Sequence, residues 1–163
     1  MTYAVHNMVG AQPIADTSST QQHPLGTIVR ATSPTYGSGE FIYLQGVAAT
    51  AVGQIVQYDA AYVTAMHTTG LSSPRPVAVA MSANVASQYG WYQISGLAVV
   101  KKANTVSFAA GAALAANATA GAIAAVSGLI LNGAIVAVVA SAKSNVTTVQ
   151  VMVNRPHAPS DVS

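Results

Sequence analysis

The sequence predicts an all-β protein, with a compact domain of the β-sandwich or barrel type that follows an extended N-terminal arm. Runs rich in Ile, Val, Phe and Tyr are short and end at glycines, as strands do. Glycine turns separate them at spacings of roughly 8 to 12 residues, which is typical of sandwiches and barrels. A chain of 163 residues suits one such domain. We divide it into an arm (1–38), a β domain (39–156) and a C-terminal tail (157–163).

The N-terminal segment has the composition of loops. The stretches DTSSTQQHPLG and ATSPTYGSG surround Pro24 and Pro34 with Ser, Thr, Gln and Gly. Because large apolar side chains are few, we expect an arm that becomes ordered on another surface, or else a mobile terminus. The first residues lack a basic stretch followed by an apolar core, so we expect no secretory signal.

The first strands of the domain are predicted from composition and alternation. EFIYLQG (40–46) and GQIVQYDAAYV (53–63) are rich in β-branched and aromatic residues. RPVAVAMSA (75–83) alternates large and small side chains, which is the period of a strand. One face is then made by Val77, Val79 and Met81, and the other by Ala78, Ala80 and Ser82.

The aromatic stretch WYQIS (91–95) is predicted to be a strand between two glycines. Alternation places Tyr92 and Ile94 on one face, and Trp91 on the other with Gln93 and Ser95. One face is expected to fill the core. The face of Trp91 is expected either to lie against a neighbouring subunit or to be buried within its own domain.

The forty residues between Lys102 and Lys143 carry no formal charge. A membrane-spanning helix is one interpretation, but each interior glycine costs a helix about 1 kcal/mol, and glycines and asparagines recur throughout. We predict short strands and tight turns in TVSFAAG (105–111), AALAANATAGAIAAV (112–126) and GLILNGAIVAVVA (128–140). The last stretch lacks alternation, which predicts a strand buried on both faces.

The final strand is predicted in VTTVQVMV (146–153), where Val149, Val151 and Val153 share one face. Thr148, Gln150 and Met152 lie on the opposite face, so the strand is expected to be half-buried. Pro156 is expected to end it, because proline cannot donate to a β-ladder.

Charge is scarce in this chain. Only 6% of the residues are charged, against about 25% in an ordinary soluble domain. Six basic and four acidic residues give a net charge of +2, too weak a field to attract a polyanion, so we expect no nucleic-acid partner, even though Lys101 and Lys102 follow Trp91 closely. The absence of Cys excludes disulfides and thiolate metal sites.

Candidate catalytic and metal-binding residues are few. Asp16 and Asp161 lie in the expected tails, which leaves Glu40 and Asp59 as the acids of the domain. A group of a serine with His67 and Asp59 is the enzymatic alternative, but no Gly-x-Ser-x-Gly turn presents the serine. We therefore expect no enzyme, no cofactor and no metal. Spacing typical of metal ligands is lacking among the four histidines, His6, His23, His67 and His157.

Three stretches carry a family likeness: GEFIYLQGVAATAVGQIVQYD, RPVAVAMSANVASQYGWYQISGLAVV and VQVMVNRP. Over residues 39–156 the chain resembles the capsid decoration (cement) proteins of tailed bacteriophages. The resemblance implies a β-rich homotrimer on the outer surface of an icosahedral head, made in the bacterial cytoplasm and clamping neighbouring subunits of the major capsid protein. No catalytic motif comes with it. The Ala-rich residues 109–125 depart from the pattern.

The composition agrees with such a role, because a nearly uncharged β-rich surface needs subunit contacts to cover its edges and apolar patches. We expect capsid or subunit contacts at Pro24, Arg30, Arg75, Trp91 and Arg155. Arginine forks suit carboxylates at interfaces, although each arginine could equally be a solvated surface charge.

We further expect binding to the expanded shell and not to its precursor, since the site would span several capsid subunits. The alternatives are another virion part, such as a fibre base or tail component, and a membrane-inserted protein that uses the Ala-rich segment.

Overall fold

The computed structural model of the chain describes residues 2–69, 75–104, 106–125, 130–138 and 147–158. These residues form strands and no helix, so the all-β prediction is confirmed. The strands are β1 (Ala4–Val5), β2 (Thr17–Ser18), β3 (Ile28–Ser33), β4 (Gly37–Gln45), β5 (Ile55–Tyr58), β6 (Thr64–Met66), β7 (Val77–Ala80), β8 (Tyr89–Lys101), β9 (Ala113–Ala116), β10 (Ile123–Ala125), β11 (Ile130–Val136) and β12 (Thr148–His157).

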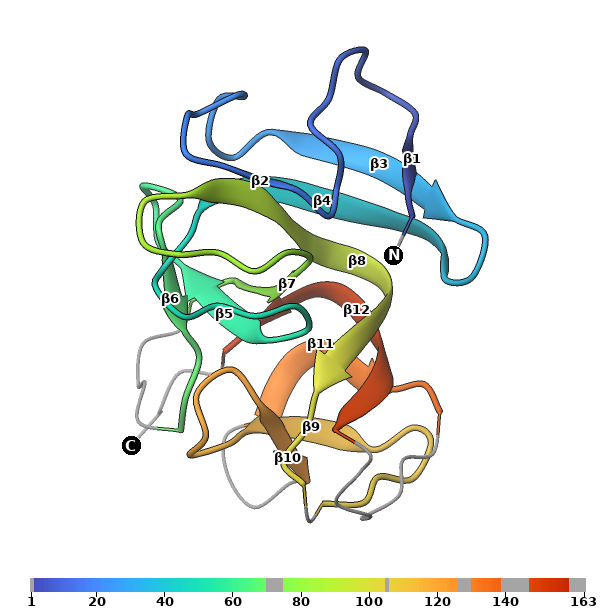
Figure 1. Ribbon diagram of the computed structural model, residues 1–163. Helices are drawn as coiled ribbons and strands as arrows, with labels where there is room; N and C mark the ends of the chain where they lie inside the picture. Colours follow the sequence, from blue (N-terminus) through green and yellow to red (C-terminus); the bar gives the residue numbers. More distant parts are fainter. Residues whose placement is uncertain (1, 70–74, 105, 126–129, 139–146, 159–163) are drawn as a thin grey trace.

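The 13-residue strand β8 joins the upper and lower halves of the molecule (Figure 1). Its first part pairs with β4 from Tyr89 to Ser95, and its second part pairs with β12 from Ser95 to Lys101. The strand order is β1-β3-β4-β8-β12-β11-β9-β10, and β7, which carries β5 and β6, also pairs with β8. The sheet is antiparallel and does not close into a barrel.

Strand β8 changes partner at a bulge. The register between β4 and β8 shifts just after Glu40, which lies opposite Ser95. The two strands approach so closely that a Cβ on Gly96, which has φ +99°, would lie 2.5 Å from the carbonyl oxygen of Ser38. The buried Gln93 donates from Nε2 to the carbonyl oxygen of Ser95 at 3.1 Å. Glycine and the buried amide therefore allow three strands to meet at Ser95.

The apolar side chains form three buried clusters. The largest fills the lower half between β7, β8 and the β9–β12 strands, the second lies beneath the N-terminal segment, and the third lies between β4, β8 and β5–β7. Val77 and Val79 face the first cluster while Ala78 and Ala80 face the third, as alternation predicted. Met81 lies beyond the end of β7 and packs in the second cluster instead.

The N-terminal residues lie on the chain's own sheet. Ile14 is buried in the second cluster, and Trp91 Nε1 donates to the carbonyl oxygen of Gln12 at 2.9 Å. The predicted boundary at residue 38 falls inside β4, which begins at Gly37. Residues 28–33, which were assigned to the arm, form β3 and pair with β4 along their whole length. Val29 and Ala31 are buried while their polar neighbours face outward, so this half-polar strand resembled a loop in composition.

Strand β12 continues to His157 and does not end before Pro156 as predicted. Arg155 has φ +46°, and the register with β11 shifts between Asn132 and Ala134. This bulge accommodates the proline, which needs no ladder hydrogen bond there. The predicted tail thus begins inside β12, and residues 159–163 lie outside the described residues. The buried face predicted for the strand is confirmed at Val149, Val151 and Val153.

Strand β11 is buried on one face only, and the prediction of two buried faces is wrong. Leu131 and Val136 are buried, whereas Ile130 and Ile135 are 42% and 51% exposed. A register shift around Gly133, which has φ +77°, interrupts the alternation of buried and exposed residues, so the sequence does not show which face is buried.

The rest of the Ala-rich segment forms the paired short strands β9 and β10. The predicted stretch 105–111 forms no strand among its described residues, 106–111. Within the described part of the chain, no helix is long and apolar enough to span a membrane.

Candidate interaction surface

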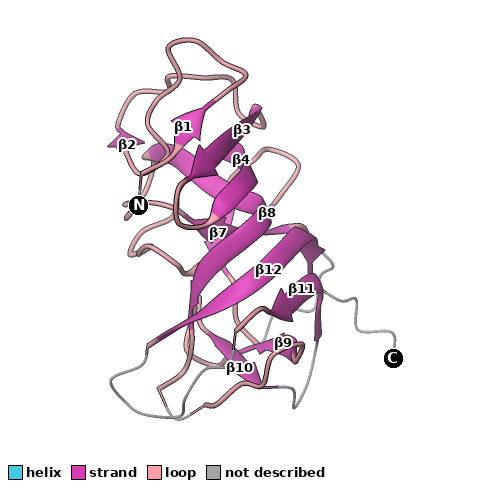
Figure 2. Ribbon diagram, turned by 90° about the vertical axis from the view of Figure 1, so that its right-hand side faces the viewer, coloured by secondary structure: helices cyan, strands magenta, loops and turns pink. Residues whose placement is uncertain are grey.

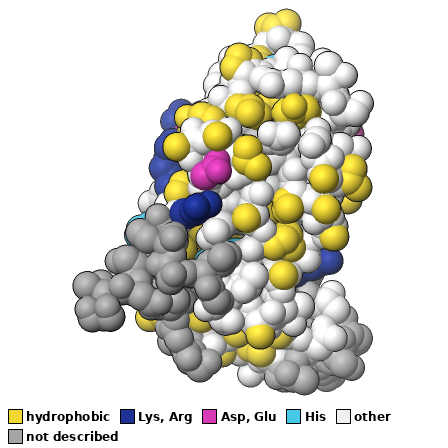
Figure 3. Space-filling view, turned by 90° about the vertical axis from the view of Figure 1, so that its left-hand side faces the viewer, with side chains coloured by type: hydrophobic (Ala, Val, Ile, Leu, Met, Phe, Trp, Pro, Cys, Tyr) yellow, Lys and Arg dark blue, Asp and Glu magenta, His cyan; other side chains and the backbone are white. Residues whose placement is uncertain are grey.

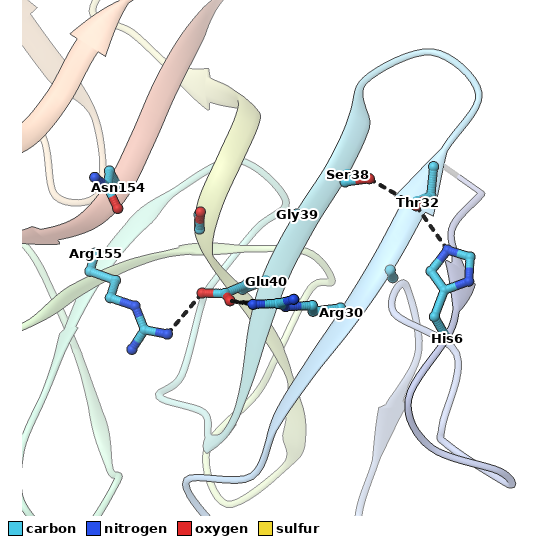
Figure 4. Close-up of a pocket in the computed structure, with 10 residues that line it drawn as sticks. His6, Arg30, Thr32, Ser38, Gly39, Glu40, Asn154 and Arg155 are labelled. Atoms are coloured by element: carbon cyan, nitrogen blue, oxygen red, sulfur yellow. Dashed lines mark hydrogen bonds and ion pairs between the residues drawn. The ribbon is translucent and has the colours of Figure 1, made fainter.

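Two of the arginines predicted to make contacts converge on one carboxylate (Figure 4). Arg30 Nε donates to Glu40 Oε1 at 3.2 Å, and an η nitrogen of Arg30 lies 3.2 Å from the same oxygen. Arg155 Nη2 donates to Glu40 Oε2 at 2.8 Å. The Glu40 side chain is 19% exposed, while those of Arg30 and Arg155 are 75% and 60% exposed.

The sheet register places these side chains together. Arg30 on β3 lies opposite Glu40 on β4, Glu40 lies opposite Ser95 on β8, and Ser95 lies opposite Asn154 on β12. Arg155 follows Asn154 at the β12 bulge, where its positive φ turns the chain so that the guanidinium reaches back to Glu40. Four strands therefore contribute to one row of polar side chains.

The cluster borders an open hollow of about 510 Å³. His6 Nε2 lies 2.8 Å from Thr32 Oγ1, which lies 3.1 Å from Ser38 Oγ, so imidazole and hydroxyl groups form its other side (Figure 4). The lining residues are His6, Arg30, Ala31, Thr32, Ser38, Gly39, Glu40, Ser95, Asn154 and Arg155.

The arrangement suits the binding of an anion from outside the chain. Two guanidinium groups share one carboxylate, which leaves a formal charge of +1 in the cluster. Each guanidinium has five N–H groups, and only a minority of them contact Glu40. Exposed ion pairs of this kind stabilise a fold by at most about 1 kcal/mol. The arginines thus contribute little to stability and remain available for a further carboxylate.

Trp91, predicted as a contact residue, is fully buried and is corrected to a core residue. The ring of His23 lies 5.4 Å from its ring, and the ring of Tyr43 lies 4.9 Å away at 61°. Tyr43 Oη donates to Gln12 Oε1 at 3.0 Å. The N-terminal segment therefore occupies the face that a neighbouring subunit was expected to cover.

The other two predicted contact residues lie apart from the cluster. Pro24 is exposed in the loop before β3. Arg75 is half-buried, its carbonyl oxygen accepts from the backbone N–H of Ala158 at 2.9 Å, and it does not line the hollow. Within the described residues no ion pair joins Arg75.

The residues considered for catalysis or nucleic-acid contact are buried or bonded to the backbone of the fold. Asp59 Oδ1 accepts from the backbone N–H groups of Ala61 and Val63 at 3.0 and 3.1 Å, which closes the turn before β6. His67 is buried, and burial lowers the pKa of its imidazole below the usual value. Lys102 is buried, with Nζ donating to two backbone carbonyls. The described residues contain no group of metal-ligating side chains.

Glu40, which joins the two arginines, was considered in the sequence only as a possible acid of catalysis. The pairing of β3 with β4 would have placed it opposite Arg30, had β3 been recognised as a strand. The approach of Arg155 has no such local signal, since Arg155 and Glu40 are 115 residues apart.

No family model, no curated protein and no solved structure matches this chain.

Proposed function

We propose that the protein is a structural virion component that binds the outer surface of an icosahedral phage head and stabilises the expanded lattice of the major capsid protein. The observation that carries this proposal is the exposed pair Arg30 and Arg155 around Glu40 on a chain with very little other charge, an arrangement that suits a directional contact. The resemblance of residues 39–156 to capsid decoration proteins supplies the class of partner.

The character of the surface supports a protein that acts through contacts. Figure 3 shows one face on which hydrophobic side chains are spread among uncharged polar atoms, with few charged side chains in the described part. Large apolar side chains that are at least 43% exposed include Val9, Val52, Ile135, Val138 and Met152. A lattice of identical subunits would cover such surface, and homotrimers would add the contacts of three copies by avidity.

The mechanism is preferential binding. A site that touches several capsid subunits is complete only when those subunits are in the expanded register, so binding stabilises that state by mass action. Contacts that are individually weak suffice, because the copies on a head act together.

Sedimentation with purified heads tests the proposal. The protein is mixed with mature heads, with immature heads of the phage that encodes it, and with heads of an unrelated phage as control. We expect it to co-sediment with mature heads only. Equal binding to mature and immature heads would refute the preference for the expanded lattice. Binding to purified tails, with none to any head, would favour a tail or fibre component instead.

A further inference from the structure

A row of apolar side chains lies beside the row of polar side chains, on the solvent side of the sheet. Leu97 on β8 lies opposite Met152 on β12, and Met152 lies opposite Ile135 on β11. Met152 is 45% exposed, Ile135 is 51% exposed and Leu97 is half-buried. On the inner side of the same strands, Ala98 and Val151 are buried in the core, so the row is not needed to fill it.

The two rows are neighbours on adjoining positions of the same strands. Leu97 follows Ser95 by two residues on β8, and Met152 precedes Asn154 by two residues on β12. At about 3.4 Å per residue, the apolar row lies about 7 Å from the row that borders the arginine hollow. Figure 2 shows β3, β4, β8, β12 and β11 following one another down this side of the molecule.

We infer that the arginine cluster and the row Leu97–Met152–Ile135 form one docking site for a segment of another protein that carries an Asp or Glu carboxylate beside apolar side chains. This rests on the proposed function, under which the segment belongs to the major capsid protein. The carboxylate binds between Arg30 and Arg155, and the neighbouring apolar side chains pack on Met152 and Ile135. An apolar centre beside a charged rim is the usual anatomy of a protein interface.

Charge complementarity selects another protein over a second copy of this chain. The site has a formal charge of +1 and needs an acidic partner. This chain has only four acidic residues; Glu40 already lies in the cluster, and Asp59 Oδ1 accepts from two backbone N–H groups. Among the described residues this leaves Asp16 as the one exposed acid that a second copy could offer, and the cross-linking experiment below distinguishes that case. A partner richer in carboxylates meets the need better, and the arginines then give direction and register while the apolar contact gives affinity.

Binding of variants to mature heads tests this inference separately from the proposed function. The first variant combines Arg30→Gln with Arg155→Gln, and the second combines Ile135→Thr with Met152→Gln. The matched controls are Lys101→Gln, which removes a positive charge outside the hollow, and Val85→Thr, in the loop between β7 and β8. Thermal unfolding verifies that each variant is folded.

We expect each double variant to bind heads at least about tenfold more weakly, as loss of central contacts does, and the controls to bind like the wild type. Added salt should weaken only the part of the binding affinity that comes from Arg30 and Arg155, because salt screens charges and not apolar contacts. If the wild type binds and the double variants bind equally well, the docking site is refuted while the proposed function stands. If the wild type itself does not bind, the proposed function is refuted.

Site-directed cross-linking gives an answer even if a double variant fails to fold. Because the chain has no Cys, Met152→Cys introduces a single thiol for a photoreactive maleimide, and Val85→Cys serves as the control. On mature heads we expect Met152→Cys to form an adduct with the capsid protein and Val85→Cys to form none. Adducts only with a second copy of this chain, or none at all, would refute the inference.

Discussion

Replacement of Gly96 by Ala tests the close approach of β4 and β8 that positions Glu40. Gly96 has φ +99°, and an added Cβ would lie 2.5 Å from the carbonyl oxygen of Ser38 and 3.0 Å from the Cα of Gly39. Both contacts are with backbone, so no side chain can rotate away. The strands β4 and β8 must separate to admit the methyl group.

The matched control is Gly37→Ala in the turn between β3 and β4. Gly37 also has a positive φ, +71°, but a Cβ there would meet nothing within 4 Å. Both substitutions incur the cost of a left-handed Ala, about 1–2 kcal/mol, and both reduce the entropy of the unfolded chain equally. The difference between them therefore reports the crowding between β4 and β8, which costs about 1–3 kcal/mol in packed interiors, together with the greater backbone strain of Ala at φ +99°, further from the left-handed region than φ +71°.

Thermal unfolding followed by the fluorescence of Trp91 measures this difference, since Trp91 is the single tryptophan and is fully buried. For a chain of this size 1 kcal/mol shifts the Tm by about 2–4 °C. We expect Gly96→Ala to melt at least several degrees below Gly37→Ala, and to bind heads more weakly because Glu40 is displaced. Equal melting temperatures for the two variants would refute the close approach of β4 and β8 at Gly96.

Three further predictions concern single side chains. Trp91→Phe removes the hydrogen bond to the Gln12 carbonyl and should cost about 1–3 kcal/mol, with faster proteolysis of residues 2–27; unchanged proteolysis would contradict the role of this bond. Burial lowers the pKa of His67 below 6.5, so its contribution to stability should be complete above pH 6.5 and be lost as the pH falls through the lower folded pKa. The wild type should therefore lose more stability in denaturant titrations between pH 7 and pH 5 than His67→Gln, and parallel profiles would refute the assignment. Glu40→Gln should change the free energy of unfolding by less than about 1 kcal/mol, because both arginines are largely exposed; a larger loss in urea denaturation would make the cluster a structural element.

Strand faces were predictable where a strand is regular. Alternation in β8 correctly separated Trp91 from Tyr92, and alternation in β12 correctly separated Val151 from Met152, because the period of a strand is two wherever its ladder is unbroken. Bulges defeated the same reasoning. The register of β11 shifts at Gly133, so the single buried face of β11 could not be predicted from the sequence. The bulge at Arg155 allows β12 to continue beyond Pro156, so the end of β12 could not be predicted either.

Two arginines of the candidate site can be singled out from the sequence, but neither Glu40 nor the assembly of the three side chains can. Arg30 and Arg155 were chosen because arginine suits interfaces, yet their meeting at Glu40 depends on β12 lying beside β8, a pairing between distant parts of the chain. Trp91 was misassigned as a contact for the same reason. The segment that covers it is polar in composition, and only the folded chain brings Gln12 and His23 onto the indole.

The position of β12 has a consequence for how the chain folds during synthesis. Strand β12 lies between β8 and β11, although the ribosome makes it after both. Until residues 148–157 have emerged from the exit tunnel, β8 and β11 each hold an unpaired edge that can recruit a strand from another nascent chain. The central seam of the sheet is thus completed last, so expression at a slow rate or low temperature should favour monomers that finish their own sheet over aggregates.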